Sequence, residues 1–137
     1  MLVLVDTNIL VYAFDPSQGE KHFAAARICH ELLEQDSVCL STQVLQELYV
    51  TLTRKARIPE ETALSVLDDL SQWPVFSVDY SAIRDAAVTA RDFRLSFWDA
   101  LLVVAANRLG AAQLLTEDLN HGQSISGVEV RNPFASS

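Results

Sequence analysis

The sequence predicts an α/β fold in which helices flank a short, mostly parallel sheet. Short aliphatic runs such as Leu2–Val5 lack the polar alternation of a half-exposed strand, which is typical of parallel strands covered on both faces. Stretches with helical periodicity separate these runs, and strands that alternate with helices are joined by right-handed crossovers. A three-layer, doubly wound arrangement is therefore expected.

Apolar spacing and helix-capping residues predict each element in turn. Strands are expected at residues 2–5, 38–40, 75–78, 111–115 and 128–130, and helices at 9–14, 20–35, 42–56, 59–71, 82–91 and 96–110. Ser41 is a suitable N-cap for the third helix, and Pro59 suits the first turn of the fourth. Pro74 ends that unit, Asp79 or Ser81 can cap the fifth helix, and Gly110 has the usual C′ position after the last one.

The chain has the size and composition of one folded domain. Its 137 residues are 50% hydrophobic and 20% charged, which excludes a disordered chain. A single domain over residues 1–137 is expected, with a tail at 133–137 that is free to fray. No apolar stretch is long enough to span a membrane, and the N-terminus has no basic segment before Asp6, so we expect a cytoplasmic protein. Cys29 and Cys39 have no metal-site or redox spacing and are expected to be reduced core residues.

Asp6 follows the opening strand directly and has two alternative interpretations. Ligands of open α/β sheets bind in the crevice beyond the carboxyl ends of the strands, so an acid at this position is a candidate for chemistry. Alternatively, Asp6 or Asn8 caps the helix that begins near Ile9 and accepts hydrogen bonds from its free amides. The strand alone leaves both alternatives open.

Three further acids lie at element ends or beside apolar stripes, and each has a structural alternative. Glu47 flanks the apolar stripe of the third helix, where the alternative is an ordinary surface glutamate. Asp99 lies three residues after Ser96, a spacing close to that of a capping box. Asp118 follows the fourth strand as Asp6 follows the first, and its alternative is a turn aspartate.

Neighbouring positions for the first and fourth strands would bring Asp6 and Asp118 to one edge of the sheet. If all four acids converge, their mutual repulsion raises their proton affinity, and a hard divalent cation such as Mg²⁺ or Mn²⁺ relieves it. A metal with open water positions suits phosphate substrates, because it lowers the pKa of an attacking water. The residues alone thus indicate a candidate cation site.

The acidic balance of the chain bears on nucleic-acid binding. A formal net charge of −8 argues against a protein whose whole surface binds phosphates. If four carboxylates belong to a cation site, the rest of the molecule carries −4, and local basic patches can remain. Candidates are Arg54, Lys55 and Arg57, and also Arg91 and Arg94, although cations at these helix ends also offset the macrodipole.

Four segments form an ordered set of acidic motifs. They are Leu4-Val5-Asp6-Thr7-Asn8-Ile9-Leu10, Gln46-Glu47-Leu48, Phe97-Trp98-Asp99-Ala100-Leu101 and Leu115-Thr116-Glu117-Asp118-Leu119-Asn120-His121-Gly122-Gln123. Their order and spacing resemble PIN-domain ribonucleases and, more narrowly, VapC-type toxins of bacterial toxin–antitoxin pairs. The resemblance covers residues 3 to about 131. Each motif alone is weak, and the four in order are specific.

The resemblance implies a Rossmann-like, three-layer PIN domain and an endoribonuclease that hydrolyses RNA phosphodiester bonds with Mg²⁺, for which Mn²⁺ can substitute. The implied catalytic acids are Asp6, Glu47, Asp99 and Asp118, and the implied supporting polar residues are Thr7, Asn8 and Thr116. Asp6, Asp99 and Asp118 would lie at the metal, with Glu47 and Asp118 holding its bound waters or a second ion. A metal-activated water would leave a 5′-phosphate and a 3′-hydroxyl. The pattern assigns no role to Glu117.

The resemblance also implies partners. Proteins of this type are homodimers, and an antitoxin segment across the active-site groove silences them. Phe14, Phe23, Tyr49 and Trp73 are candidates for such contacts, with core packing as the alternative. An acidic pocket is a natural receptor for a basic side chain of the partner.

Two other functions compete with this interpretation. The main alternative is a non-catalytic, PIN-like module that only binds protein or RNA, against which the intact acidic set argues. A phosphohydrolase of another α/β type is disfavoured, because the opening lacks the Asp-x-Asp signature of haloacid-dehalogenase-like enzymes.

Overall fold

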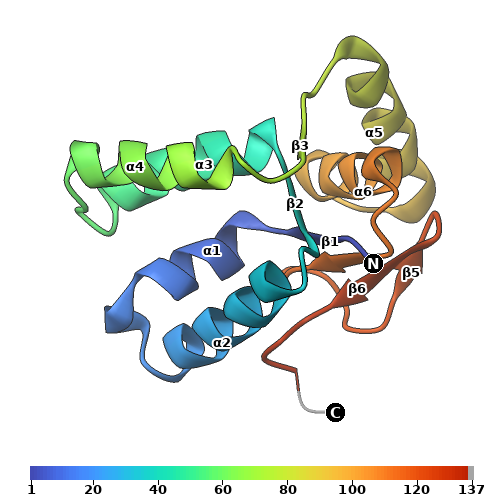
Figure 1. Cartoon of the computed structure of the whole chain (residues 1–137). Helices are drawn as coiled ribbons and strands as arrows, with labels where there is room; N and C mark the ends of the chain where they lie inside the picture. Colours follow the sequence, from blue (N-terminus) through green and yellow to red (C-terminus); the bar gives the residue numbers. More distant parts are fainter. Residues whose placement is uncertain (136–137) are drawn as a thin grey trace.

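A computed structural model describes residues 1–135 and contains one mixed sheet with helices on both sides (Figure 1). The strands are β1 (Val3–Val5), β2 (Val38–Ser41), β3 (Val75–Phe76), β4 (Gln113–Leu115), β5 (Ser124–Ile125) and β6 (Val128–Arg131). The helices are α1 (Thr7–Phe14), α2 (Glu20–Glu34), α3 (Thr42–Arg54), α4 (Glu60–Leu70), α5 (Tyr80–Phe93) and α6 (Phe97–Leu109), with a 3-10 turn at Pro16–Gln18. The predicted α/β fold class is confirmed.

In the strand order β3-β2-β1-β4-β6-β5, the order in which strands are added to the sheet reverses between β1 and β4, although these two strands are parallel. The chain first runs outward from β1 through β2 to β3 and then returns to the other side of β1. Because parallel crossovers are right-handed, this return places its helices on the opposite face of the sheet. Figure 1 accordingly shows α1 and α2 on one side and α5 and α6 on the other. The crevice at such a reversal is where open α/β sheets bind ligands.

The core lies on both faces of the two central strands. β1 pairs in parallel with β2 and β4, with Leu4 opposite Cys39 on one side and Leu114 on the other. All three side chains are fully buried. α6 packs across β1, β2 and β4 and is buried without a break from Ala100 to Ala106, because α5 covers its outer face. α3 packs against both α1 and α4, and Figure 1 shows α3 and α4 side by side.

The observed elements differ from the predicted ones at the start of α1, at the end of β3 and in the additional strand β5. α1 begins at Thr7 rather than Ile9, because Asp6 is its N-cap. β3 ends at Phe76, after which the backbone N–H of Val78 donates to the hydroxyl of Thr42 rather than to a neighbouring strand. β5 is an additional two-residue antiparallel strand joined to β6 by a tight turn.

That turn has positive φ at both central residues, 51° at Ser126 and 84° at Gly127, as a two-residue hairpin of the favoured twist requires. In the C-terminal tail, Pro133 and Phe134 form a turn, and the Phe134 ring packs edge-on against Tyr12 at 5.3 Å. Residues 136–137 of the predicted tail lie outside the described residues.

The two cysteines are buried and form no disulfide with each other. Burial raises the pKa of each thiol to about 11, so neither is activated as a nucleophile. Within residues 1–135, no helix has both the length and the apolar character needed to cross a membrane.

Candidate functional site

Asp6 lies at the carboxyl end of β1 and is both a helix cap and a buried acid. Its Oδ1 accepts the backbone N–H of Thr7 at 2.6 Å, which makes it the N-cap of α1. Its Oδ2 accepts the hydroxyl of Thr116 at 2.8 Å. The residue is 5% exposed. The two interpretations of Asp6 are therefore compatible. One carboxylate oxygen caps α1, and the other accepts a hydrogen bond from Thr116, which follows β4.

Burial raises the pKa of Asp6 from an ordinary 3.8 to about 6. The hydrogen bonds from Thr116 and Thr7 oppose this effect, and the nearby charges of Asp118 and Glu47 add to it. A buried carboxyl whose pKa is raised, and which lies near two other acids in a cleft, is a candidate functional group.

Two hydrogen bonds through the Thr116 side chain connect Asp118 to Asp6 at the end of β4. The backbone N–H of Asp118 donates to the Thr116 hydroxyl at 3.1 Å, and that hydroxyl in turn donates to Asp6. The Asn8 side-chain amide donates to Asp118 Oδ2 at 3.0 Å. Partial burial and then the charge of Asp99 raise the pKa of Asp118. The adjacent strands therefore hold the two aspartates at one edge of the sheet.

Glu47 faces the same cleft from the third helix. Gln43, one turn earlier on α3, donates its amide N–H to Glu47 Oε1 at 3.0 Å and so restricts that carboxylate. Thr7 reinforces the junction between α1 and α3, because its hydroxyl lies 3.5 Å from the backbone oxygen of Val44. Glu47 is thus an exposed glutamate of an amphipathic helix that also lines the cleft.

Asp99 lies at the margin of the cleft. It is in the first turn of α6, where its backbone N–H donates to the Ser96 hydroxyl at 3.1 Å, so the expected cap is present. Its carboxylate is close enough to raise the pKa of Asp118, but it does not line the cleft. The structure brings Asp6, Glu47 and Asp118 together and leaves Asp99 beside them.

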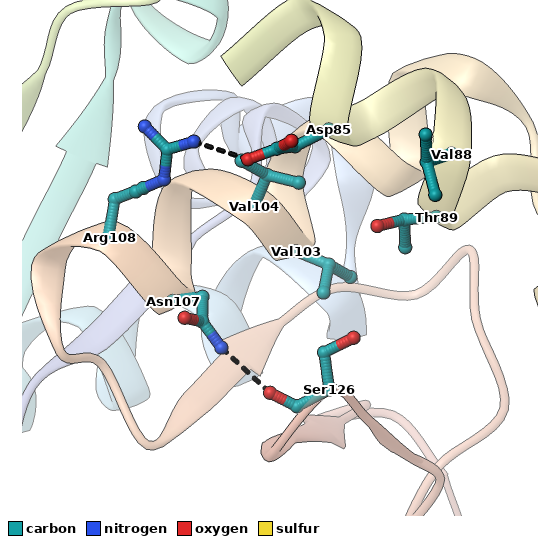
Figure 2. A pocket seen from close by; sticks show the side chains of 8 residues that line it. All are labelled: Asp85, Val88, Thr89, Val103, Val104, Asn107, Arg108 and Ser126. Atoms are coloured by element: carbon teal, nitrogen blue, oxygen red, sulfur yellow. Dashed lines mark hydrogen bonds and ion pairs between the residues drawn. The ribbon is translucent and has the colours of Figure 1, made fainter. Parts of the chain in front are cut away.

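The cleft has a volume of about 430 Å³ and is open to solvent. Apolar and polar residues of α1 and α3 form its other walls. These residues include Val11, Tyr12, Gln18, Thr51 and Lys55. A second pocket of about 240 Å³ lies between α5, α6 and the β5–β6 turn (Figure 2). Its charged residues, Asp85 and Arg108, pair with each other, and it contains none of the predicted acids.

The residues of the cleft fit a divalent cation by donor type. Asp6, Glu47 and Asp118 offer carboxylate oxygens, which hard cations prefer as ligands. Asn8 Oδ1 is buried without a hydrogen-bond partner in the structure. The lining of the cleft therefore includes a residue with an unpaired amide oxygen. Within residues 1–135, however, no three histidine, cysteine or acidic side chains form a group ready to hold a metal.

Glu117 belongs to a network that sequence reasoning missed. The hydroxyl of Tyr12 donates to Glu117 Oε1 at 2.6 Å, and Lys21 Nζ lies 2.9 Å from Oε2. The Lys21 ammonium also lies 5.1 Å from the centroid of the Tyr12 ring and 5.2 Å from that of Phe134. The fifth acid therefore ties the loop that carries Asp118 to α1, α2 and the C-terminal turn.

The sequence matches the PIN domain family over residues 3–123. The chain belongs to this family. The PIN-domain match ends before β6 and includes all four predicted acids.

Two further comparisons place this PIN domain among known proteins. It is 28% identical over 121 residues to "Ribonuclease VapC23" of Mycobacterium tuberculosis, covering 85% of this chain and 93% of that one. Among solved structures, a toxin–antitoxin complex from Klebsiella pneumoniae has a TM-score of 0.70 at 20% identity, covering 96% of this chain and 98% of the other. The M. tuberculosis toxin VapC20, described as cleaving the sarcin–ricin loop, has a TM-score of 0.63 at 20% identity, covering 82% and 86%. The structural likenesses establish the shared fold.

Proposed function

We propose that this PIN domain is a metal-dependent endoribonuclease and the toxin component of a toxin–antitoxin pair. The observation that carries the proposal is the buried Asp6, which shares a solvent-open cleft with Glu47 and Asp118 where the strand order reverses. The similarity to "Ribonuclease VapC23" supports RNA as the substrate. The likeness to toxin–antitoxin complexes supports an antitoxin as partner.

Asp6, Asp99 and Asp118 would hold Mg²⁺, for which Mn²⁺ could substitute, and Glu47 would face it across the cleft. When bound, the cation would lower the pKa of an attacking water and stabilise charge on the phosphate oxygens. The supporting residues Thr7, Asn8 and Thr116 would fix the carboxylates in place through the hydrogen bonds described above. The chain's own contribution is therefore orientation and charge rather than a nucleophilic side chain.

Exposed aromatic side chains support protein partners for this domain. Phe23 is 70% exposed on α2, and Phe14 is 39% exposed at the end of α1. Exposed apolar groups of this size are common at protein interfaces. Tyr49 and Trp73, by contrast, pack against the core. We propose that Phe14 and Phe23 contact an antitoxin or a second copy in a homodimer, in the cytoplasm.

An RNA cleavage assay with the purified protein tests the proposed activity. Cleavage is expected with Mg²⁺ and should stop when EDTA is added. Asp6→Asn should fold, because asparagine is also a good N-cap, and should be inactive. Asp69→Asn removes an exposed carboxylate that does not line the cleft and should cleave like the unmodified protein. Cleavage that persists in EDTA or in Asp6→Asn would contradict the metal mechanism.

The alternative is a non-catalytic PIN-like module that binds protein or RNA. Within the described residues, the absence of three side chains already grouped as metal ligands favours this alternative. Calorimetric titration with Mg²⁺ and Mn²⁺ distinguishes the two functions. Binding of either ion, lost in Asp6→Asn, supports the enzyme, and no binding supports the module.

A further inference from the structure

The loop after β4 carries Asp118 to the cleft, and Asp118 itself has few contacts there. Asp118 is exposed, whereas Thr116, two positions earlier, is fully buried. Within residues 1–135, the side-chain amide of Asn8 is the one hydrogen-bond donor to the Asp118 carboxylate. An exposed loop with few buried contacts is among the parts of a protein that open most easily. The place of Asp118 at the cleft therefore depends on what holds the loop.

Glu117, the residue before Asp118, is held by both oxygens of its carboxylate. Oε1 accepts the Tyr12 hydroxyl at 2.6 Å, and Oε2 lies 2.9 Å from Lys21 Nζ. The Glu117 side chain is 22% exposed and does not line the cleft, although Tyr12 does. Because both oxygens have partners outside the group of cleft acids, Glu117 is an anchor of the loop rather than a further cation ligand. Consecutive Cα atoms are about 3.8 Å apart, so this anchor restricts Asp118 directly.

The turn at residues 132–135 is joined to the far end of the same loop. The backbone N–H of Asn132 donates to His121 Nδ1 at 3.0 Å. The side-chain oxygen of Asn132 accepts the backbone N–H of Phe134 at 2.9 Å, which closes the turn. The loop and the turn thus hold each other in place, although β5 and β6 separate them along the chain.

Phe134 brings the turn back to the residues that hold Glu117. Its ring packs edge-on against the Tyr12 ring, with 5.3 Å between the centroids, and its centroid lies 5.2 Å from Lys21 Nζ. The Lys21 ammonium also lies 5.1 Å from the Tyr12 centroid, so both rings attract it. Each group that bonds Glu117 therefore has a second support, which comes from the other end of the loop.

Charge alone provides a second way for Glu117 to act on the cleft. Partial burial and the charge of Asp99 raise the pKa of Asp118, and the charge of Glu117 adds to this effect. On this basis, removal of the Glu117 carboxylate and removal of the Lys21 ammonium have opposite effects on cation binding. If Glu117 instead acts by holding the loop, both removals weaken binding. This difference in sign separates positioning from charge.

We propose that Glu117 is a positioning residue, which holds the loop so that Asp118 is in place to bind a divalent cation. Tyr12, Lys21 and Phe134 support Glu117 in this role. The inference rests on the metal-dependent function proposed above. A carboxylate that is already in place loses less conformational freedom when it binds a cation, so the affinity is higher. The acid to which the four motifs assign no role thereby acquires one.

Calorimetric titration with Mn²⁺ tests the proposal without RNA or cleavage. Glu117→Ala is expected to weaken Mn²⁺ binding about three- to tenfold, which is less than the roughly ten- to hundredfold loss typical when a group bonded directly to a metal ligand is removed. Phe134→Ala should also weaken binding, although phenylalanine carries no charge. Phe134→Tyr keeps the ring and should bind Mn²⁺ like the unmodified protein. Phe93→Ala removes a ring that is 44% exposed on α5 and should likewise leave binding unchanged.

Lys21→Met distinguishes positioning from charge. It removes a positive charge, which by charge alone would strengthen Mn²⁺ binding, whereas loss of the anchor should weaken binding about two- to fivefold. Lys21→Arg keeps the charge and should restore the affinity. Arg27→Met removes a positive charge from the same helix at an exposed residue that forms no ion pair within residues 1–135, and it should not weaken binding. Stronger binding in Lys21→Met would overturn the proposal.

A double-mutant cycle shows whether Glu117 acts through its neighbour. Asp118→Asn should itself weaken Mn²⁺ binding, and Glu117→Ala should then cause no further loss, because no carboxylate is left at residue 118 to be positioned. An equal loss in both backgrounds would show that Glu117 acts by another route and would overturn the proposal, as would unchanged binding in Asp118→Asn. Thermal unfolding ensures that each variant is titrated while folded. Reduced stability with normal Mn²⁺ binding in Glu117→Ala would show a purely structural role and would also overturn it.

The outcomes separate this inference from the proposed function. If the unmodified protein binds Mn²⁺ and cleaves RNA, while Glu117→Ala and Phe134→Ala bind Mn²⁺ as tightly as Phe93→Ala, the positioning role is wrong and the ribonuclease function stands. If the unmodified protein binds no Mn²⁺, the metal-dependent function fails and this inference fails with it.

Discussion

Thr116 donates its hydroxyl hydrogen to Asp6 Oδ2 at 2.8 Å, across a sequence separation of 110 residues. The same hydroxyl oxygen accepts the backbone N–H of Asp118 at 3.1 Å. One fully buried side chain thus links the two aspartates that follow the central strands. The spacing between these acids depends on this hydroxyl as well as on the pairing of β1 with β4.

Thr116→Val should uncouple the two aspartates. Valine has a similar shape but leaves a buried Asp6 oxygen without its donor, and we expect a loss of about 1–3 kcal/mol in the free energy of unfolding at neutral pH. The loss should be smaller at pH 5, where more of Asp6 is protonated. Denaturant unfolding of Thr116→Val beside Thr116→Ser, which keeps the hydroxyl, measures the effect. Equal stability of the two variants at neutral pH would show that the hydroxyl is unimportant.

The raised pKa of Asp6 predicts a pH dependence of stability. Between about pH 4 and 6 the folded protein retains a proton on Asp6 that the unfolded chain releases, so stability decreases as the pH rises through this window. The decrease due to Asp6 amounts to about 3 kcal/mol when no divalent cation is bound. Urea unfolding in EDTA at several pH values, with Asp6→Asn as the reference, isolates this contribution. The variant should become the more stable protein as the pH approaches 7. A difference that does not change with pH would contradict the raised pKa.

Tyr12→Phe should loosen the loop that carries Asp118. It removes the hydrogen bond to Glu117 and leaves the aromatic contact with Phe134, so we expect a loss of about 1 kcal/mol in stability. Lys21→Met should have a smaller effect, because Lys21 lies at the surface. The two changes should not be additive, since both act on Glu117, and a double-mutant cycle measures this coupling. His30→Ala, which breaks an exposed pair with Glu34, provides a control with no expected coupling to Tyr12.

Leu114→Ala tests the central position of β4. The side chain is fully buried opposite Leu4, so its truncation should cost about 2–5 kcal/mol through lost burial and the cavity left behind. Leu64→Ala on α4 removes the same atoms from a side chain that is 45% exposed and should cost much less. Thermal unfolding of the two variants compares them directly. Similar losses would show that β4 is not a central strand.

The sequence predicts the fold well because its signals are local. The aliphatic run before Asp6 and the uniformly apolar segment after Asp99 are each readable within one element. The proximity of Asp6 and Asp118 follows from the rule that parallel strands share a carboxyl edge. Neighbouring positions for β1 and β4 are confirmed by the observed pairing.

The features that the sequence does not predict depend on long-range contacts. The partners of Glu117 are 96 and 105 positions away, and no periodicity in the chain points to Lys21 or Tyr12. The junction of α3 with α6 likewise depends on the contact between Gln43 and Trp98, which come from different helices. β5 is too short to show a strand pattern, although the Ser126-Gly127 pair is a turn signal that could have indicated it.

The order of the strands also sets when the cleft can form as the chain is synthesised. β4 is inserted between β1 and β6, and it is the strand that delivers Thr116 and Asp118 to Asp6. A nascent chain on the ribosome therefore contains Asp6 and Glu47 long before it can complete the cleft. Until nearly the whole chain has emerged, Asp118 cannot join Asp6, and the unfinished protein lacks the complete cleft.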